Sequence, residues 1–199
     1  MAAYAMLGQP AALKTGGPSL RDALWRLVAI PAQRYGQAEA TVSRIVPLIL
    51  ESASDFTITQ TADLLLHLLH EHKETQLVAS VLRELSNVSA NDAKAADNSS
   101  SFMTAFIKRA PLMIFLNMDQ LIQPHLNSES YVLRRGAVRA YSQLLVQLAM
   151  MQKESPVEAS TVLEEIAPSE MVQVLYSRTA DTSTYVRTPA LEALCQVSR

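Results

Sequence analysis

Hydrophobic residues recur with helical spacing in three successive segments of the first half of the chain, around 42–53, 58–69 and 77–88. Apolar side chains spaced i, i+3, i+4 and i+7 lie on one face of a helix, and each segment follows that spacing. Short polar breaks, SDFT and HEHKE, separate the segments. Because such short connections favour antiparallel neighbours, the pattern predicts successive helical hairpins.

One proline and a polar turn divide the second half in the same way. A short helix begins at Phe102 and is interrupted by Pro111, and a second helix continues to Leu126. After the turn NSES, a long helix is expected over 131–151. Its predicted apolar face consists of Leu133, Ala137, Ala140, Tyr141, Leu144 and Leu148.

The end of the chain also follows a helical pattern. Pro156 and Pro168 each stand where a helix is expected to begin, since the missing N–H of proline costs nothing in a first turn. The last helix runs towards Val197 without a capping glycine. The chain is therefore interpreted as a fragment that stops inside an element.

The segment 89–101, SANDAKAADNSSS, interrupts this pattern because it holds no large apolar residue. Its composition predicts a linker, with two interpretations left open: a surface loop or a hinge between two subdomains. The expected organisation is a flexible segment over 1–18, hairpins over 19–88, this linker, and hairpins over 102–199, truncated at the C-terminus. Period-two strand patterns are missing, so the fold class is all-α.

Charge and cysteine content exclude several classes of protein. Seventeen Lys and Arg face nineteen Asp and Glu, a net charge of -2, so no global basic excess indicates a nucleic-acid binder. The one cysteine, Cys195, forms no internal disulfide, which favours a reducing compartment. No apolar run reaches the roughly 18 residues of a membrane span, and the N-terminus lacks a signal-peptide pattern.

A phrase of eight residues occurs twice, at 133–140 and 53 positions later at 186–193. Both copies read aliphatic-Arg-x-x-Ala-aliphatic-x-Ala. This pattern, early in a helix after a polar turn, is similar to the second helix of a HEAT repeat, whose period is about 40 to 47 residues. The excess length is assigned to the insert over 153–165. The predicted architecture is an α-solenoid of stacked HEAT-like hairpins.

The HEAT resemblance also implies a structural role for three residues. In that motif an Asp in the turn precedes the Arg by six positions, and side chains bond between successive repeats. Asp181 and Arg187 have this spacing, whereas the position six before Arg134 is Ser128. We therefore expect the bond to be disturbed at the first copy unless Glu129 substitutes.

Longer segments carry a more specific resemblance. FIKRAPLMIFLNMDQLIQPHLNSESYVLRRGAV and, further on, DTSTYVRTPALEALCQV resemble the family of condensin subunit 1, a HEAT-repeat regulatory subunit; LVASVLRELSNV extends the likeness weakly towards residue 20. The resemblance implies a non-catalytic scaffold that binds the kleisin chain, contacts the SMC ATPase heads and helps to hold DNA during mitotic chromosome condensation. It also implies a nuclear, chromosomal and partly cytoplasmic location. Another HEAT adaptor, of the transport-receptor or phosphatase-scaffold type, is the alternative.

Enzymatic and metal sites are not expected. His67, His70 and His72 invite a metal interpretation, but zinc requires about four ligands, no HExxH is present, and HLLHEHKE is typical of a helix end. No GxSxG or Gly-rich phosphate loop occurs, and Cys195 has no recognisable His partner. The expectation is no catalytic residue, no cofactor, no metal and no small-molecule substrate.

The candidate binding site is a local basic cluster. Residues 101–150 hold five basic side chains against two acidic ones. Arg134 is assigned to the repeat, which leaves Lys108, Arg109, Arg135 and Arg139 as candidates for a partner carboxylate or the DNA backbone. Arg135 and Arg139 are four positions apart and share a helical face. The competing interpretation is a solvated face paired with glutamates of the segment 154–165.

Overall fold

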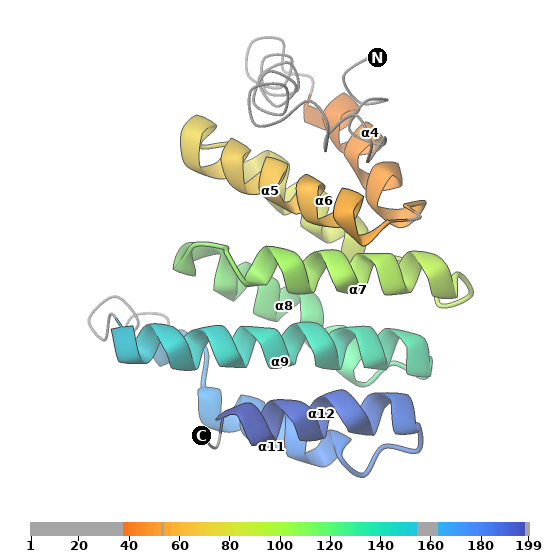
Figure 1. Ribbon diagram of the computed structural model, residues 1–199, viewed down its shortest axis with the longest axis vertical. Helices are drawn as coiled ribbons and strands as arrows, with labels where there is room; N and C mark the ends of the chain where they lie inside the picture. Colours follow the sequence, from red (N-terminus) through yellow and green to blue (C-terminus); the bar gives the residue numbers. More distant parts are fainter. Residues whose placement is uncertain (1–37, 53, 155–162, 198–199) are drawn as a thin grey trace. The chain divides into compact units, whose positions relative to one another are not determined.

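The computed structural model describes residues 38–52, 54–154 and 163–197, and all the regular elements in these ranges are helices. They are α4 (Ala38–Leu50), α5 (Asp55–His72), α6 (Thr75–Ser86), α7 (Ala93–Ile107), the 3-10 helix η1 (Leu112–Ile114), α8 (Phe115–Leu126), α9 (Tyr131–Glu154), α11 (Pro168–Arg178) and α12 (Thr184–Val197) (Figure 1). The all-α prediction is confirmed. The segment 1–18, the start of the first hairpins at 19–37 and the helix start at Pro156 lie outside the described residues.

The chain divides into two compact units, Met1–Phe106 and Ile107–Arg199. The boundary falls in the last turn of α7 and not within 89–101. The boundary between the two units therefore does not coincide with the hinge considered at 89–101.

In the first unit, α5 and α6 form a hairpin and α4 packs against both helices. Periodic burial explains why these segments are helical: Ile45 and Ile49 of α4 are fully buried, as are Leu65 of α5 and Val81 of α6. These positions belong to the apolar stripes that the sequence predicts. The three helices therefore bury the faces expected of them.

The predicted linker over 89–101 is wrong for residues 93–101, which form the first half of α7. Asp92 starts the helix, since its Oδ1 accepts the N–H of Ala95 at 2.9 Å. The small side chains Ala95, Ala96, Ser99 and Ser100 are buried. Hydrophobic periodicity misses this helix because small and polar residues, not large apolar ones, line its buried side.

Polar side chains of α7 close the C-terminal ends of two other helices. The Nδ2 of Asn98 donates to the carbonyls of Leu50 at 2.9 Å and Ser52 at 2.8 Å, at the end of α4. The hydroxyl of Ser99 donates to the carbonyl of Leu85 at 2.7 Å, near the end of α6. Helix ends leave such carbonyls without intrahelical partners, so these bonds hold α7 in place.

Lys73 ends α5 in the left-handed backbone region, with φ 57°. The N–H groups of Lys73 and Glu74 both reach back to the carbonyl of Leu68, at 3.2 Å for Glu74, and so close the end of the helix. The predicted helix end at HLLHEHKE is therefore confirmed. Glycine is the residue that favours this position, because a Cβ is strained there.

Replacing Lys73 with glycine is expected to raise the free energy of unfolding by up to about 1 kcal/mol, since it removes this strain. Urea denaturation of the wild type and the variant measures the difference. Glu84→Gly, in the regular part of α6, is the matched control and is expected to lower stability by about 1 kcal/mol. A loss of stability in both variants would contradict the strain at Lys73.

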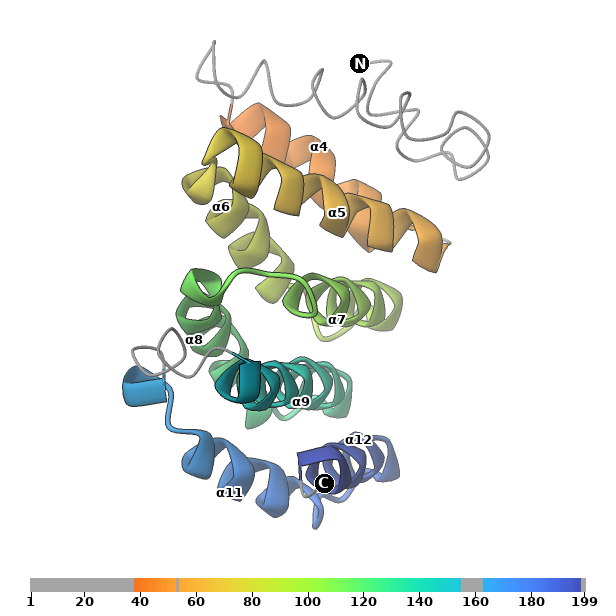
Figure 2. The ribbon, with the colours of Figure 1, turned by 60° about the vertical axis from the view of Figure 1, so that its left-hand side comes forward.

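In the second unit, α8 pairs with α9 and α11 pairs with α12, and α9 packs against all three of the others. Figure 2 shows α9 and α12 side by side in one layer and α8 and α11 in the other. The predicted break at Pro111 and the helix start at Pro168 are both confirmed.

The long helix α9 is covered on two sides. Five of its six predicted apolar positions are buried, and only Leu133 is partly exposed. Val132 and Val138 are buried as well. This coverage follows from the position of α9 between α8 and α12. The packing of α9 against α12 also places the first turns of these two helices close to each other.

Candidate functional site

The Arg134 side chain closes the turn of its own hairpin. Its Nη1 donates to the carbonyls of Ser128 and Glu129, both at 2.8 Å. These are backbone acceptors of the turn that precedes α9. The carboxylate of Glu129 makes no contact with Arg134 here, so the expected substitution by that side chain is not what holds Arg134.

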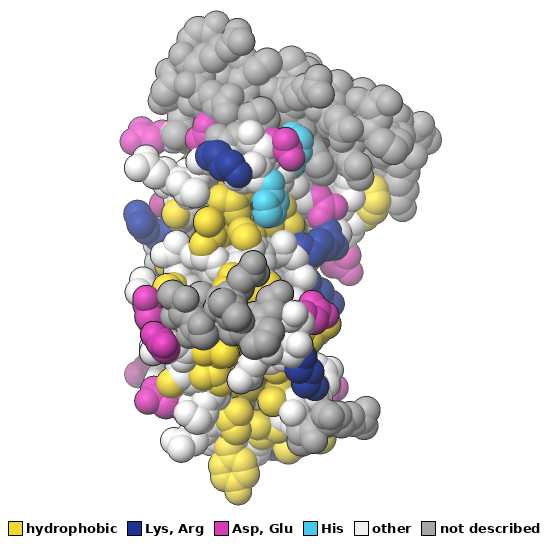
Figure 3. Space-filling model, turned by 90° about the vertical axis from the view of Figure 1, so that its left-hand side faces the viewer, with side chains coloured by type: hydrophobic (Ala, Val, Ile, Leu, Met, Phe, Trp, Pro, Cys, Tyr) yellow, Lys and Arg dark blue, Asp and Glu magenta, His cyan; other side chains and the backbone are white. Residues whose placement is uncertain are grey.

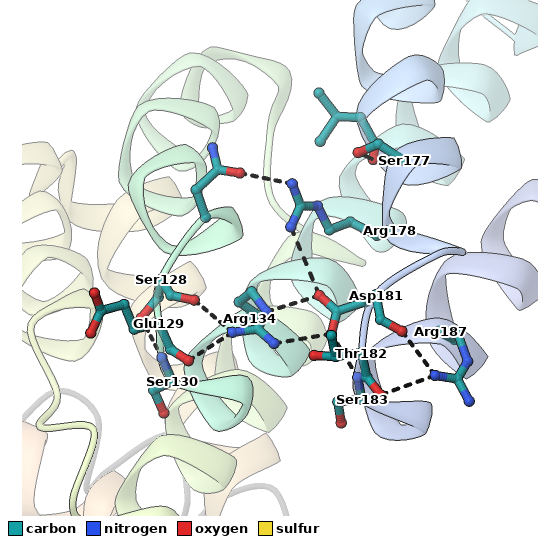
Figure 4. Close-up of polar contacts among 12 residues, drawn as sticks. Ser128, Glu129, Ser130, Arg134, Ser177, Arg178, Asp181, Thr182, Ser183 and Arg187 are labelled. Atoms are coloured by element: carbon teal, nitrogen blue, oxygen red, sulfur yellow. Dashed lines mark hydrogen bonds and ion pairs between the residues drawn. The ribbon is translucent and has the colours of Figure 1, made fainter.

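The same guanidinium also reaches the turn of the next hairpin (Figure 4). Its Nε donates to Oδ2 of Asp181 at 2.8 Å, and Nη2 donates to Oδ1 at 3.0 Å. The Arg134 and Asp181 side chains are 13% and 4% exposed. This paired geometry is the strong form of an arginine–carboxylate bond, and it ties the α8–α9 turn to the α11–α12 turn.

Arg187 repeats the local half of this arrangement. Its Nη1 donates to the carbonyls of Asp181 at 2.8 Å and Thr182 at 3.1 Å, six and five residues before it, as Arg134 does in its own turn. Its Nη2 donates to the hydroxyl of Thr184. The bond expected between successive copies is therefore present, and it runs from the first Arg to the second Asp, so a serine at position 128 does not disturb it.

The Asp181 carboxylate has two further contacts in and near its turn. Its Oδ1 accepts the N–H of Ser183 at 2.9 Å, and Arg178 Nη1 lies 3.8 Å from Oδ2. The hydrogen bond from Arg134 is the main cause that lowers the pKa of Asp181 below its ordinary value of 3.8. In turn, the bond to Asp181 raises the pKa of Arg134. The carboxylate stays ionised across the neutral and mildly acidic range.

Acidic pH is expected to remove the contribution of the ionised Asp181 carboxylate to the free energy of unfolding. Because folding lowers its pKa, the stabilisation is fully present above the ordinary pKa of 3.8 and is lost as the pH falls through the lower pKa of the folded state. The difference in the free energy of unfolding between the wild type and Asp181→Asn should therefore shrink as the pH falls below the ordinary pKa of 3.8. Unfolding of both proteins at a series of pH values measures it, and a difference that stays constant would contradict the ion pair. Glu192→Gln is the control.

The four basic candidates do not form one cluster. Lys108 and Arg109 are exposed and precede η1 and the start of α8, whereas Arg135 and Arg139 lie in the first half of α9. Since α8 and α9 run antiparallel, the start of α8 lies beside the end of α9, away from these arginines. On the face drawn in Figure 3, Lys and Arg side chains stand apart among acidic, hydrophobic and other side chains.

Arg135 has a contact on the neighbouring helix. Its guanidinium carbon lies 6.0 Å from the centre of the Tyr185 ring, a cation–π arrangement. Tyr131 lies beside Tyr185, with ring centres 6.2 Å apart. Sequence reasoning missed these two tyrosines; the signal for them is that each lies in the first turn of a helix that carries a copy of the repeated phrase.

A polar group inside the second unit connects α8 to α9. Burial raises the pKa of Asp119, and burial together with the charge of Asp119 raises the pKa of Tyr141 to about 12. Gln123 donates to Asp119 Oδ2 at 2.8 Å. A cavity of about 220 Å³ lies next to Gln123, Tyr141 and Arg178. Because the bonded side chains come from both helices, we interpret the group as a hydrogen-bond network that holds α8 against α9.

Within residues 38–52, 54–154 and 163–197, no three His, Cys, Asp or Glu side chains are grouped so that they could hold a metal ion. His67 is half-buried and His70 is exposed near the end of α5. In the same ranges no helix is long and apolar enough to cross a membrane.

No protein-family model matches the chain, and no curated protein matches it.

Proposed function

We propose that this chain is part of a non-catalytic binding scaffold, an α-solenoid in which HEAT-like hairpins stack through their turns. The observation that carries the proposal is the bond from Arg134 to Asp181, which joins one turn to the next. Arg187, 53 positions after Arg134, has the same contacts to its own turn. A helical hairpin that repeats both the eight-residue sequence and the contacts of its arginine is suited to stacking on further copies.

Burial at equivalent positions supports stacking on the second hairpin as well. Val138 of α9 is fully buried beside its neighbours, whereas Leu191, its equivalent on α12, is 51% exposed. A further hairpin placed on α12 as α12 is placed on α9 would cover Leu191 and bring a turn towards Arg187. Stacks of this kind form long surfaces that bind other proteins rather than enclosed catalytic pockets.

The proposed identity is a condensin-type scaffold, supported by the resemblance of 106–138 and 181–197 to condensin subunit 1. In this proposal the chain contributes to binding the kleisin subunit and the SMC ATPase heads, on chromosomes and in the nucleus during mitosis. DNA is engaged by the assembled complex, since the basic residues of this chain lie apart. No cofactor or small-molecule substrate takes part.

Co-purification tests the identity. The tagged protein is mixed with recombinant kleisin and SMC heads and passed over a size-exclusion column; we expect one peak that contains all three. An unmixed elution, or a native purification that yields phosphatase or transport-receptor partners instead, would overturn the condensin assignment. A variant with Lys153→Glu, an exposed residue at the end of α9, controls for changes in surface charge alone.

A further inference from the structure

The first turns of α9 and α12 together form an exposed aromatic surface. Tyr131 is 46% exposed and Tyr185 is 65% exposed. Their rings are tilted by 32° with centres 6.2 Å apart, and Arg135 lies over the Tyr185 ring. Large aromatic side chains this exposed and this close together are typical of contact surfaces, because they bury much area with few rotatable bonds.

Arg139 extends this surface with a positive charge. It lies one helical turn after Arg135, its side chain is exposed, and it makes no ion pair with any residue that the structure describes. Like charges four positions apart on a helix repel each other, and a bound anion removes the repulsion. The surface thus offers two ring faces and a cationic edge.

We propose that the surface made of Tyr131, Tyr185, Arg135 and Arg139 binds an acidic segment of a partner protein in which carboxylates alternate with aromatic or aliphatic side chains. Carboxylates pair in two-pronged geometry with guanidinium groups, and apolar side chains pack on tyrosine rings. This proposal goes further than the scaffold function because it names the chemistry of a partner. Only the biological role of the surface rests on the proposed scaffold function.

The small number of basic side chains favours a protein segment over nucleic acid. Lys108 and Arg109 precede α8 and are not adjacent to this surface, which leaves Arg135 and Arg139. Two arginines neutralise about two phosphates, which is far fewer than the six to ten contacts typical of tight DNA binding.

Fluorescence anisotropy with a short labelled peptide of alternating glutamate and phenylalanine tests the proposal. The wild type is expected to bind it, and Arg139→Glu to weaken binding by about tenfold, because a charge pair at the rim is reversed. Tyr185→Ala is expected to weaken binding severalfold. The matched control Lys153→Glu makes the same change of charge at the other end of α9 and should leave binding within twofold of the wild type. The glutamine version of the peptide should bind weakly to all four proteins.

Several outcomes would overturn the proposal. These are no binding by the wild type, an equal loss in Arg139→Glu and Lys153→Glu, and tighter binding of a single- or double-stranded oligonucleotide whose salt dependence Arg139→Glu reduces. Arg139 has no described partner, so its variant should fold, and circular dichroism checks this. If kleisin and SMC heads fail to bind while the peptide binds as expected, the condensin assignment fails and this surface stands.

Discussion

Replacing Asp181 with alanine is expected to lower the free energy of unfolding of the second unit by about 3 kcal/mol. The change removes two charge-assisted bonds from Arg134 and the acceptor for the Ser183 N–H. It also leaves the Arg134 guanidinium, only 13% exposed, without its carboxylate. Urea unfolding with hydrogen exchange in α9 and α12 measures the loss, which should appear as earlier opening between these helices.

A double-mutant cycle isolates the bond itself. Arg134→Ala, Asp181→Ala and the double variant should give a coupling energy of about 1 to 3 kcal/mol, because the two side chains contact each other directly. Glu192→Ala removes an exposed carboxylate from α12 and is expected to change stability by less than about 0.5 kcal/mol. A coupling energy near zero would show that the two turns are held by hydrophobic packing alone, and the proposed stacking through turns would lose its main support.

Hydrophobic periodicity predicts most of the helices because large apolar side chains fill their buried faces. It predicts α4, α5, α6, α8 and α9 from the sequence alone. It fails for the first half of α7, where Ala96 and Ser99 pack and Asn98 bonds to the ends of other helices. A pattern based on apolar residues has no signal for a helix that is held by hydrogen bonds to carbonyls elsewhere in the chain.

The contacts of the candidate site are likewise only partly predictable from the sequence. The repeated phrase identifies Arg134 and Arg187 as equivalent, and the structure gives them equivalent contacts to their own turns. The partner of Arg134 across the hairpins is 47 residues away, so no local rule identifies it; the HEAT resemblance alone implies a bond between copies. The pairing of Tyr131 with Tyr185 depends on how α9 and α12 pack, which sequence spacing does not specify.

Replacing Asn98 with alanine is expected to lower the free energy of unfolding of the first unit by about 2 kcal/mol. Its Nδ2 holds the carbonyls of Leu50 and Ser52, and these partly buried acceptors would be left without that donor. The loss should be localised: amide hydrogen exchange at the end of α4 should quicken more than exchange within α5. Urea unfolding and hydrogen exchange on the same samples measure both effects.

The neighbouring Ser101→Ala variant separates this role from helix propensity. Ser101 is exposed in the same helix, so its replacement by alanine should leave stability unchanged or raise it by up to about 0.5 kcal/mol. Both variants increase the intrinsic helix propensity of α7, and only Asn98→Ala removes bonds to another helix. If both raised stability, α7 would be held by propensity and apolar packing rather than by its polar side chains. A loss in Asn98→Ala alone would show that a segment without large hydrophobic residues is fixed as a helix by the carbonyl ends it covers.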